Sequence, residues 1–277
     1  MSGGGGVIDL HTHSTASDGQ YSPSETASRA ARAGTEVWAL TDHDTVAGQE
    51  AAAAEAHRLG MRFVPGIELS VFLDLREIHV LGHFVDPAHA TLRRFEDFLA
   101  DRRRERMGKI IAKLAALGLR LTPDDIVRHS GGKTIGRPHV ARALVAAGAV
   151  ATVKEAFDRY LGEGKPAFEG RYRLTAEEAV SLVRGAGGVA TLAHPGVSKI
   201  EAYDLARLKA IGFEGVEARH PDHVPSQLEK YLRIAAEVDL VPTSGSDFHG
   251  EAVSPERLLG TATMPAEDLE RLERRRP

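Results

Sequence analysis

The sequence predicts an α/β protein in which parallel strands are wrapped by helices, and two observations lead to that prediction. Short strand-like runs alternate with helical stretches along most of the 277 residues, a pattern typical of parallel β-α units. The alternation is broken once, where helical patterns follow one another without a strand between them. Seven strand-like runs favour a barrel over an open sheet, so we predict an α/β barrel that carries a helical insertion.

The elements of the predicted barrel follow in order along the chain. The helix after the first strand has clear end signals, because Ser22 and Glu25 have the spacing of a capping box, Pro23 occupies the first helical position and Gly34 ends the helix. The alanine-rich stretch 45–60 predicts a second helix. The strand-like runs cover residues 7–13, 36–43, 62–69, 77–84, 188–194, 213–220 and 240–247.

The predicted insertion consists of helical patterns punctuated by glycines. The patterns cover residues 88–117, 122–130, 138–147 and 152–161. We therefore predict a barrel formed by residues 7–99 and 173–277 and a helical insertion formed by residues 100–172. Because its glycine-rich loops can move, we expect the insertion to act as a partial lid over the substrate.

Composition excludes several classes of protein. The 35 Lys and Arg against 39 Asp and Glu give a net charge of −4, which argues against a dedicated duplex-DNA-binding protein. The absence of cysteine excludes disulfides, thiolate metal sites and cysteine nucleophiles. No stretch approaches the roughly 20 apolar residues that span a bilayer, and the first residues lack a signal-peptide pattern. We therefore expect a cytoplasmic protein without a membrane partner, and nothing indicates an obligate protein partner.

Histidines and carboxylates occur at the ends of the predicted strands. The carboxyl ends of parallel strands meet on one face, so these residues should converge in space. Burying so many of them without a metal would leave unpaired charges and donors. Imidazole and carboxylate ligands without sulfur suit Zn, Mn or Fe(II). The residues concerned are His11, His13, His43 between Asp42 and Asp44, Glu68, His194, Asp247 and His249.

The motifs at these positions resemble those of the PHP (polymerase and histidinol phosphatase) phosphoesterases, over residues 7 to about 260. The motifs are His11-Thr12-His13-Ser14 with Asp18-Gly19, Thr41-Asp42-His43-Asp44, Pro65-Gly66-Ile67-Glu68, His79-Val80-Leu81-Gly82, Ala193-His194-Pro195 and Gly245-Ser246-Asp247-Phe248-His249. The resemblance implies a distorted seven-stranded barrel holding two or three divalent ions. It also implies a first ion held by His11, His13, Glu68 and Asp247, a second held by Glu68, His79 and His194, and a third held by Asp18, His43 and His249.

The insertion supplies the candidate substrate contacts. Glycines beside single basic residues allow backbone and charge to approach a phosphate together. The segment Gly136-Arg137-Pro138-His139 also resembles the PHP subgroup that acts on nucleoside 3′,5′-bisphosphates and on short RNA from its 5′ end. The candidate substrate-binding residues are Lys133, Arg137, Lys165 and Arg171, together with His220 at the end of a predicted strand.

These observations predict a metal-dependent phosphoesterase that removes the 3′-phosphate of nucleoside 3′,5′-bisphosphates or releases nucleotides from the 5′ end of short RNA. A histidinol-phosphate-type phosphomonoesterase remains an alternative, since it needs only one phosphate site. An amidohydrolase-type enzyme would use similar ligands on a C–N bond but would not need the cationic insertion. An inactive metal-binding domain is a third alternative, and it would tolerate lost ligands, of which the motifs show none.

Overall fold

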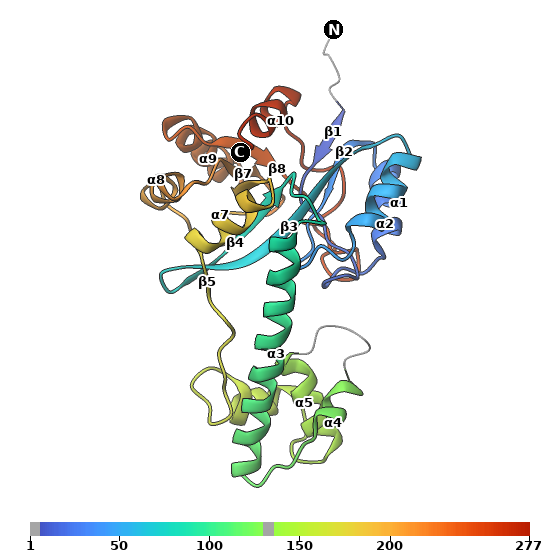
Figure 1. Ribbon diagram of the computed structural model, residues 1–277, viewed down its shortest axis with the longest axis vertical. Coiled ribbons are helices and arrows are strands. Elements are labelled where there is room, and N and C mark those ends of the chain that lie inside the picture. Colours follow the sequence, from blue (N-terminus) through green and yellow to red (C-terminus); the bar gives the residue numbers. More distant parts are fainter. Residues whose placement is uncertain (1–5, 130–135) are drawn as a thin grey trace. The chain divides into compact units, whose positions relative to one another are not determined.

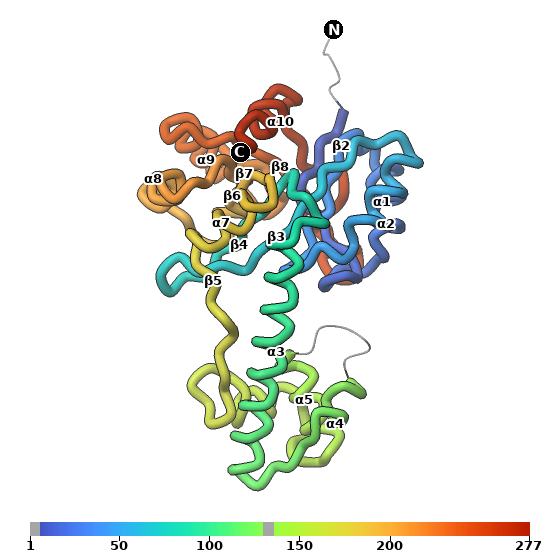
Figure 2. The backbone as a smooth tube through the Cα atoms, in the orientation of Figure 1, coloured from blue at the N-terminus to red at the C-terminus, as the bar shows by residue number. Residues whose placement is uncertain are grey.

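The computed structural model describes residues 6–129 and 136–277, and the chain divides into two compact units. Unit 1 consists of Met1–Arg93 with Arg173–Pro277, and unit 2 consists of Arg94–Tyr172. The chain leaves unit 1 along the helix α3 (Ala90–Ala116) and returns at the short strand β5 (Leu174–Thr175), as Figure 2 traces. The first boundary between these units lies inside α3, between Arg93 and Arg94, whereas the sequence analysis placed the start of the insertion at residue 100.

Unit 1 is built on a mixed sheet with the strand order β1-β2-β3-β4-β6-β7-β8, and β5 pairs with β3 (Figure 1). Each of the seven predicted strand regions contains a strand, so the α/β class is confirmed. The strand β5 was not predicted. Besides β5, the strands are β1 (Val7–Asp9), β2 (Thr35–Leu40), β3 (Arg62–Leu73), β4 (Arg76–His83), β6 (Val189–Leu192), β7 (Gly215–Arg219) and β8 (Val241–Ser244).

The prediction that all strands run parallel is wrong for β4, which pairs antiparallel with both β3 and β6. Only Asp74 and Leu75 connect β3 to β4, and a two-residue connection joins antiparallel strands only. Asp74 has a φ of 58°, the left-handed conformation that tight turns require. As a consequence Glu68 does not end its strand, because β3 continues to Leu73, and His79 likewise lies inside β4.

In the part of unit 1 that the structure describes, six helices lie around the sheet. The helix α1 starts as predicted, because the Ser22 hydroxyl accepts a hydrogen bond from the Glu25 N–H and Pro23 occupies the first turn. Figure 1 shows α1 and α2 side by side next to β2, where their alanines pack against the fully buried Trp38. The helices are α1 (Pro23–Arg32), α2 (Gln49–Arg58), α7 (Ala176–Gly185), α8 (Ala202–Ile211), α9 (Pro225–Glu237) and α10 (Ala266–Glu273).

Backbone hydrogen bonds hold the segment after β1 beside the segment after β8. The Leu10 N–H donates to the Ser244 carbonyl at 3.1 Å, and the Asp247 N–H donates to the His11 carbonyl at 2.9 Å. Further on, the His13 N–H donates to the Phe248 carbonyl at 2.9 Å. Residues more than 230 positions apart in the sequence are thereby brought together at one end of the sheet.

Unit 2 is helical and has a hydrophobic core of its own. Its helices are the greater part of α3, α4 (Pro123–Val127), α5 (Arg137–Ala146), α6 (Val153–Ala156) and a π-helical turn at Phe157–Leu161. Ile126, Leu144 and Leu161 are completely buried in this core. Within the described ranges, no helix combines the length and the apolar character needed to cross a lipid bilayer.

The substitution Leu144→Ala is expected to destabilise unit 2 by about 2–5 kcal/mol, because it removes a buried side chain and leaves a cavity. Urea unfolding followed by circular dichroism measures this change. The matched control is Val127→Ala on α4, whose residue is 49% exposed and should change the free energy of unfolding by less than about 0.5 kcal/mol. Equal effects of the two substitutions would contradict the packing described.

Candidate metal centre

The predicted metal ligands converge at one end of the sheet in unit 1. Three groups of side chains place their ligand atoms within 4.8 Å of one another. Because a metal ion needs several donors within bonding reach of one point, each group is a candidate ion site. The groups are His11, His13, Glu68 and Asp247; His13, Asp18, His43 and His249; and His43, Glu68 and His79.

The groups differ in detail from the three ligand sets that the resemblance implied. The first group has the same four members, whereas His13 joins the third set in the structure. In the structure, the group that contains Glu68 and His79 includes His43 in place of His194. His194 is outside that group, but its Nε2 atom lies 3.4 Å from Glu68 Oε1. All the predicted ligands are therefore gathered, and their division among individual ions stays a prediction.

Glu68 belongs to two of the three groups, as do His13 and His43. Its Oε2 atom lies 3.3 Å from His11 Nε2 and 3.1 Å from His13 Nε2. The same oxygen lies 3.1 Å from His43 Nδ1, while Oε1 lies 2.7 Å from His79 Nδ1. The Glu68 side chain is completely buried, so its carboxylate is surrounded by four imidazoles in the interior of unit 1.

The local backbone explains how these side chains reach one another. His11 and His13 are two residues apart in an extended segment, so both point to the same side. A Cβ atom added at Gly245 would lie 2.2 Å from the Cβ atom of His11, so only glycine allows this approach. His194 and Asp247 have φ values of 25° and 50°, in a region that residues with a side chain rarely occupy. Such strain clusters at functional sites.

Sequence reasoning missed Glu217, a completely buried residue of β7. Its Oε1 atom lies 3.0 Å from His11 Nδ1, and its Oε2 atom accepts a hydrogen bond from the His194 N–H at 2.8 Å. Burial alone would raise the pKa of Glu217, but the facing His11 ring lowers it to about 2. The Glu217 carboxylate is therefore placed to orient His11 and His194, two candidate ligands, without being a member of the ligand groups itself. The available signal was an acid at the centre of the short strand β7.

Carboxylates and imidazoles in the buried centre shift one another's pKa values. Burial lowers the pKa of His13, but hydrogen bonds to the carboxylates of Asp247 and Glu68 raise it to about 9. Burial raises the pKa of Asp247, but the charge of His11 and the hydrogen bonds from His13 and His220 together lower it well below its usual range. The carboxylates thus stay ionised and favour a cation among them.

The donor atoms fit a divalent cation. Among the residues that the structure describes, four buried side-chain atoms of the candidate ligands make no hydrogen bond, although native proteins satisfy most buried polar groups. The atoms are His13 Nδ1, His43 Nδ1, His194 Nδ1 and Glu68 Oε2. A cation accepts electron pairs from such atoms without requiring a donated proton. Nitrogen and oxygen donors without sulfur suit Zn, Mn or Fe(II).

The polar residues that flank the ligands have structural partners. Asp42 accepts hydrogen bonds from the N–H and hydroxyl of Ser14 at 2.8 and 2.7 Å, and from the Ser17 hydroxyl at 2.6 Å. The hydroxyl of Ser14 therefore points at a carboxylate that fixes the loop after β1. Asp44 accepts a hydrogen bond from the Ser70 N–H at 3.2 Å. The two aspartates therefore fix segments of the chain that lie beside His43.

The candidate substrate residues lie in two places. His220 is in unit 1, where its completely buried Nε2 atom lies 3.5 Å from Asp247 Oδ2. In unit 2, Arg137 starts α5, and its guanidinium donates to the Leu161 carbonyl at 3.1 Å. Lys165 and Arg171 are exposed in the same unit, and Lys133 lies outside the described residues. Their role in substrate binding stays a prediction.

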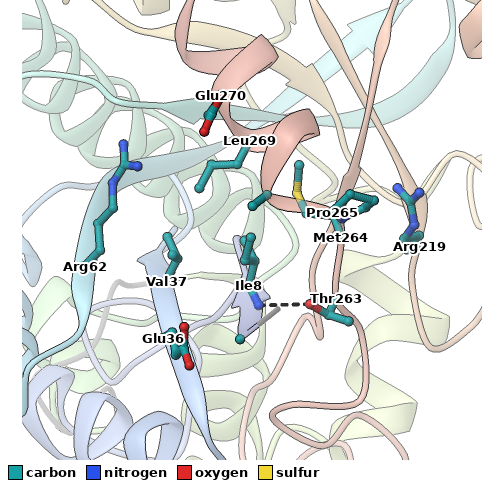
Figure 3. Close-up of a pocket in the computed structure, with 12 residues that line it drawn as sticks. Ile8, Glu36, Val37, Arg62, Arg219, Thr263, Met264, Pro265, Leu269 and Glu270 are labelled. Atoms are coloured by element: carbon teal, nitrogen blue, oxygen red, sulfur yellow. Dashed lines mark hydrogen bonds between the residues drawn. The ribbon is translucent and has the colours of Figure 1, made fainter. Parts of the chain in front are cut away.

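A cavity of about 610 Å³ lies away from the candidate ligands, at the starts of the first strands (Figure 3). Ile8, Val37 and Arg62 line it, and each comes earlier in the chain than the candidate ligands that lie in or after its strand. The Ile8 N–H donates to the Thr263 hydroxyl at 3.0 Å at the edge of the cavity. Because the cavity faces the opposite ends of the strands, it takes no part in the metal centre.

Comparison with known proteins gives the family. The 3′,5′-nucleoside bisphosphate phosphatase of Chromobacterium violaceum is 36% identical over 268 residues, which cover 93% of this chain and 92% of that protein. A family model described as the PHP domain matches residues 9–120. The chain belongs to the PHP family.

Two further comparisons agree with the assignment to the PHP family. The 5′-3′ exoribonuclease Rnm of Salmonella typhimurium is 34% identical over 252 residues, covering 88% of this chain and 85% of that protein. A solved chain from Bifidobacterium adolescentis, assigned to the metal-dependent phosphoesterases, is 29% identical with a TM-score of 0.76 and covers 98% of this chain and 96% of its own length. Together these findings confirm the predicted enzyme class, a hydrolase of phosphoester bonds in a metal-dependent PHP family.

Proposed function

We propose that this PHP enzyme removes the 3′-phosphate of nucleoside 3′,5′-bisphosphates and also releases nucleotides from the 5′ end of short RNA. The observation that carries the proposal is the convergence of imidazoles and carboxylates on buried Glu68. The substrate class is supported by the names of relatives that span most of the chain, a nucleoside bisphosphate phosphatase and exoribonucleases.

We propose that the centre binds two or three divalent ions, Mn, Zn or Fe, through the predicted ligands. When bound, such ions would lower the pKa of a coordinated water and neutralise charge on the phosphoryl oxygens. Glu217 would hold the His11 ring in the orientation that directs Nε2 to the centre, and it would fix the backbone of His194. Glu68 would bridge two of the ions, because its two oxygens face different imidazoles.

We further propose that the sheet of unit 1 closes as the distorted barrel that the sequence favours. The support is the set of backbone hydrogen bonds between the segments that follow β1 and β8, the two end strands of the observed order. A closed arrangement would bring ligands from strands at both ends of that order to one centre.

The second phosphate requires a cationic contact, and we propose that unit 2 supplies it through Arg137. The Arg137 guanidinium is half-buried, 5.0 Å from the centroid of the Phe168 ring, and donates one hydrogen bond to the Leu161 carbonyl. A planar guanidinium fixed by a carbonyl and an aromatic ring is well suited to recognise phosphate. Lys133, Lys165 and Arg171 are the further candidates in this unit.

The rates of hydrolysis of four substrate classes test the proposed function. With Mn²⁺ present, a nucleoside 3′,5′-bisphosphate and a short 5′-phosphorylated RNA should react faster than histidinol phosphate, and an amide should not react. A preference for histidinol phosphate would favour the phosphomonoesterase alternative. Ammonia released from an amide would favour the amidohydrolase alternative.

The substitution Arg137→Ala is expected to lower kcat/KM for a nucleoside 3′,5′-bisphosphate by about 10- to 150-fold, the equivalent of one charge-assisted hydrogen bond of about 1.5–3 kcal/mol. The loss for a nucleotide with one phosphate should be much smaller, because only the bisphosphate uses the contact. Steady-state kinetics on both substrates measure the two losses. Both kcat and KM are needed, because binding energy from a remote phosphate also appears in kcat.

Two variants control this prediction. Arg137→Lys should recover part of the loss, since lysine offers a point charge where arginine offers a planar fork. Arg142→Ala removes an exposed arginine from the same helix and should leave both substrates unaffected. Equal losses on the two substrates in Arg137→Ala would show that Arg137 does not distinguish the second phosphate.

A further inference from the structure

Arg257 contacts the metal centre although no motif of the sequence includes it. It lies in the turns that follow β8, and its side chain is only 20% exposed. Its Nη1 atom donates to Asp247 Oδ2, and its Nη2 atom donates to Asp222 Oδ2 at 2.6 Å. One guanidinium therefore joins a candidate metal ligand to a second carboxylate outside the ligand groups.

The two oxygens of Asp247 have different surroundings. Oδ1 faces the cluster, 3.3 Å from His11 Nε2 and 3.2 Å from His13 Nε2. Oδ2 faces Arg257 and the His220 ring instead. A carboxylate can bind a cation through one oxygen or through both. Because Oδ2 is paired with arginine, only Oδ1 is directed at the cluster.

The anchor of Arg257 is itself fixed. The backbone N–H of Asp222 donates to His220 Nδ1 at 3.1 Å. A neutral imidazole that accepts at Nδ1 carries its proton on Nε2, and this is the atom that lies 3.5 Å from Asp247 Oδ2. Asp222, Arg257 and His220 thus form a support on the outer side of Asp247.

We propose that Arg257 is a positioning residue that restricts Asp247 to coordination through Oδ1 and thereby strengthens cation binding at the group of His11, His13, Glu68 and Asp247. The inference rests on the proposed metal centre. The positive charge of Arg257 also repels a nearby cation. Removal of Arg257, however, would leave the carboxylates of Asp247 and Asp222 without the cation between them. Their repulsion would turn Asp247 out of place, so the loss of orientation outweighs the loss of repulsion.

The dissociation constant of Mn²⁺, measured on the full chain without substrate, tests this inference. After chelator treatment and dialysis, Arg257→Gln should bind Mn²⁺ about 10- to 100-fold more weakly than the wild type, the usual cost of losing a partner of a metal ligand. Arg257→Lys should lie between the two, because an ammonium pairs well with one carboxylate but does not span both. The matched control Arg233→Gln, on the exposed face of α9, should bind as the wild type does.

A second variant keeps the test valid if Arg257→Gln fails to fold. Asp222→Asn leaves Asp247 and Arg257 in place but removes the charge that anchors the guanidinium, so it should weaken Mn²⁺ binding by a smaller factor. Unchanged or tighter Mn²⁺ binding in the folded variants would overturn the inference. A wild type that binds Mn²⁺ but hydrolyses no phosphoester would overturn the proposed function alone, so the two failures are distinguishable.

Discussion

Replacing Glu68 by glutamine is expected to lower kcat/KM for phosphoester hydrolysis by more than about 100-fold. This exceeds the usual cost of changing a residue that only supports a ligand. Glu68 is the completely buried carboxylate around which the imidazoles of His11, His13, His43 and His79 gather. Glutamine keeps the shape of the side chain but removes the negative charge that the proposed bridge between two ions requires.

Steady-state kinetics at saturating Mn²⁺, combined with the metal content of each protein, measure this effect. The fall in activity should be accompanied by a fall in bound metal per chain. The control Glu237→Gln makes the same chemical change at an exposed position of α9 and should leave both quantities unchanged. Wild-type activity in a folded Glu68→Gln protein would contradict the bridging role.

The strand-like runs and helix caps were predictable because they depend on local sequence. Ser22 and Pro23 start α1 as their residue types require. The direction of β4 could not be read from its own residues, because it depends on the length of the connection that precedes it. The two-residue turn at Asp74 and Leu75 was therefore the relevant signal, and alternation with helices was a misleading one.

The candidate ligands were predictable because histidine and carboxylate at strand ends are unusual unless something pairs with them. Their division among ions was not predictable, because it depends on differences of a few tenths of an ångström between the distances around Glu68 and His194. Glu217 and Arg257 were missed for a different reason. Glu217 contacts His11, which is 206 positions away, and Arg257 contacts Asp247 across the turns that follow β8. Both contacts are set by the fold and not by a local sequence pattern.

The most direct test of the central claim is the release of phosphate from a nucleoside 3′,5′-bisphosphate before chelation, after chelation and after the return of Mn²⁺. The claim is that phosphoester hydrolysis requires cations held by the residues gathered around Glu68. Elemental analysis of the same samples gives the metal bound per chain at each step, and circular dichroism checks that the chain stays folded.

Chelation should reduce phosphate release to the background rate, and Mn²⁺ should restore it in proportion to the metal bound, with the nucleoside 5′-monophosphate as the product. This result follows if the chain itself supplies ligands but no nucleophile for the reaction, since Ser14 is paired with Asp42. Full activity in a folded protein shown to contain no metal would contradict the account.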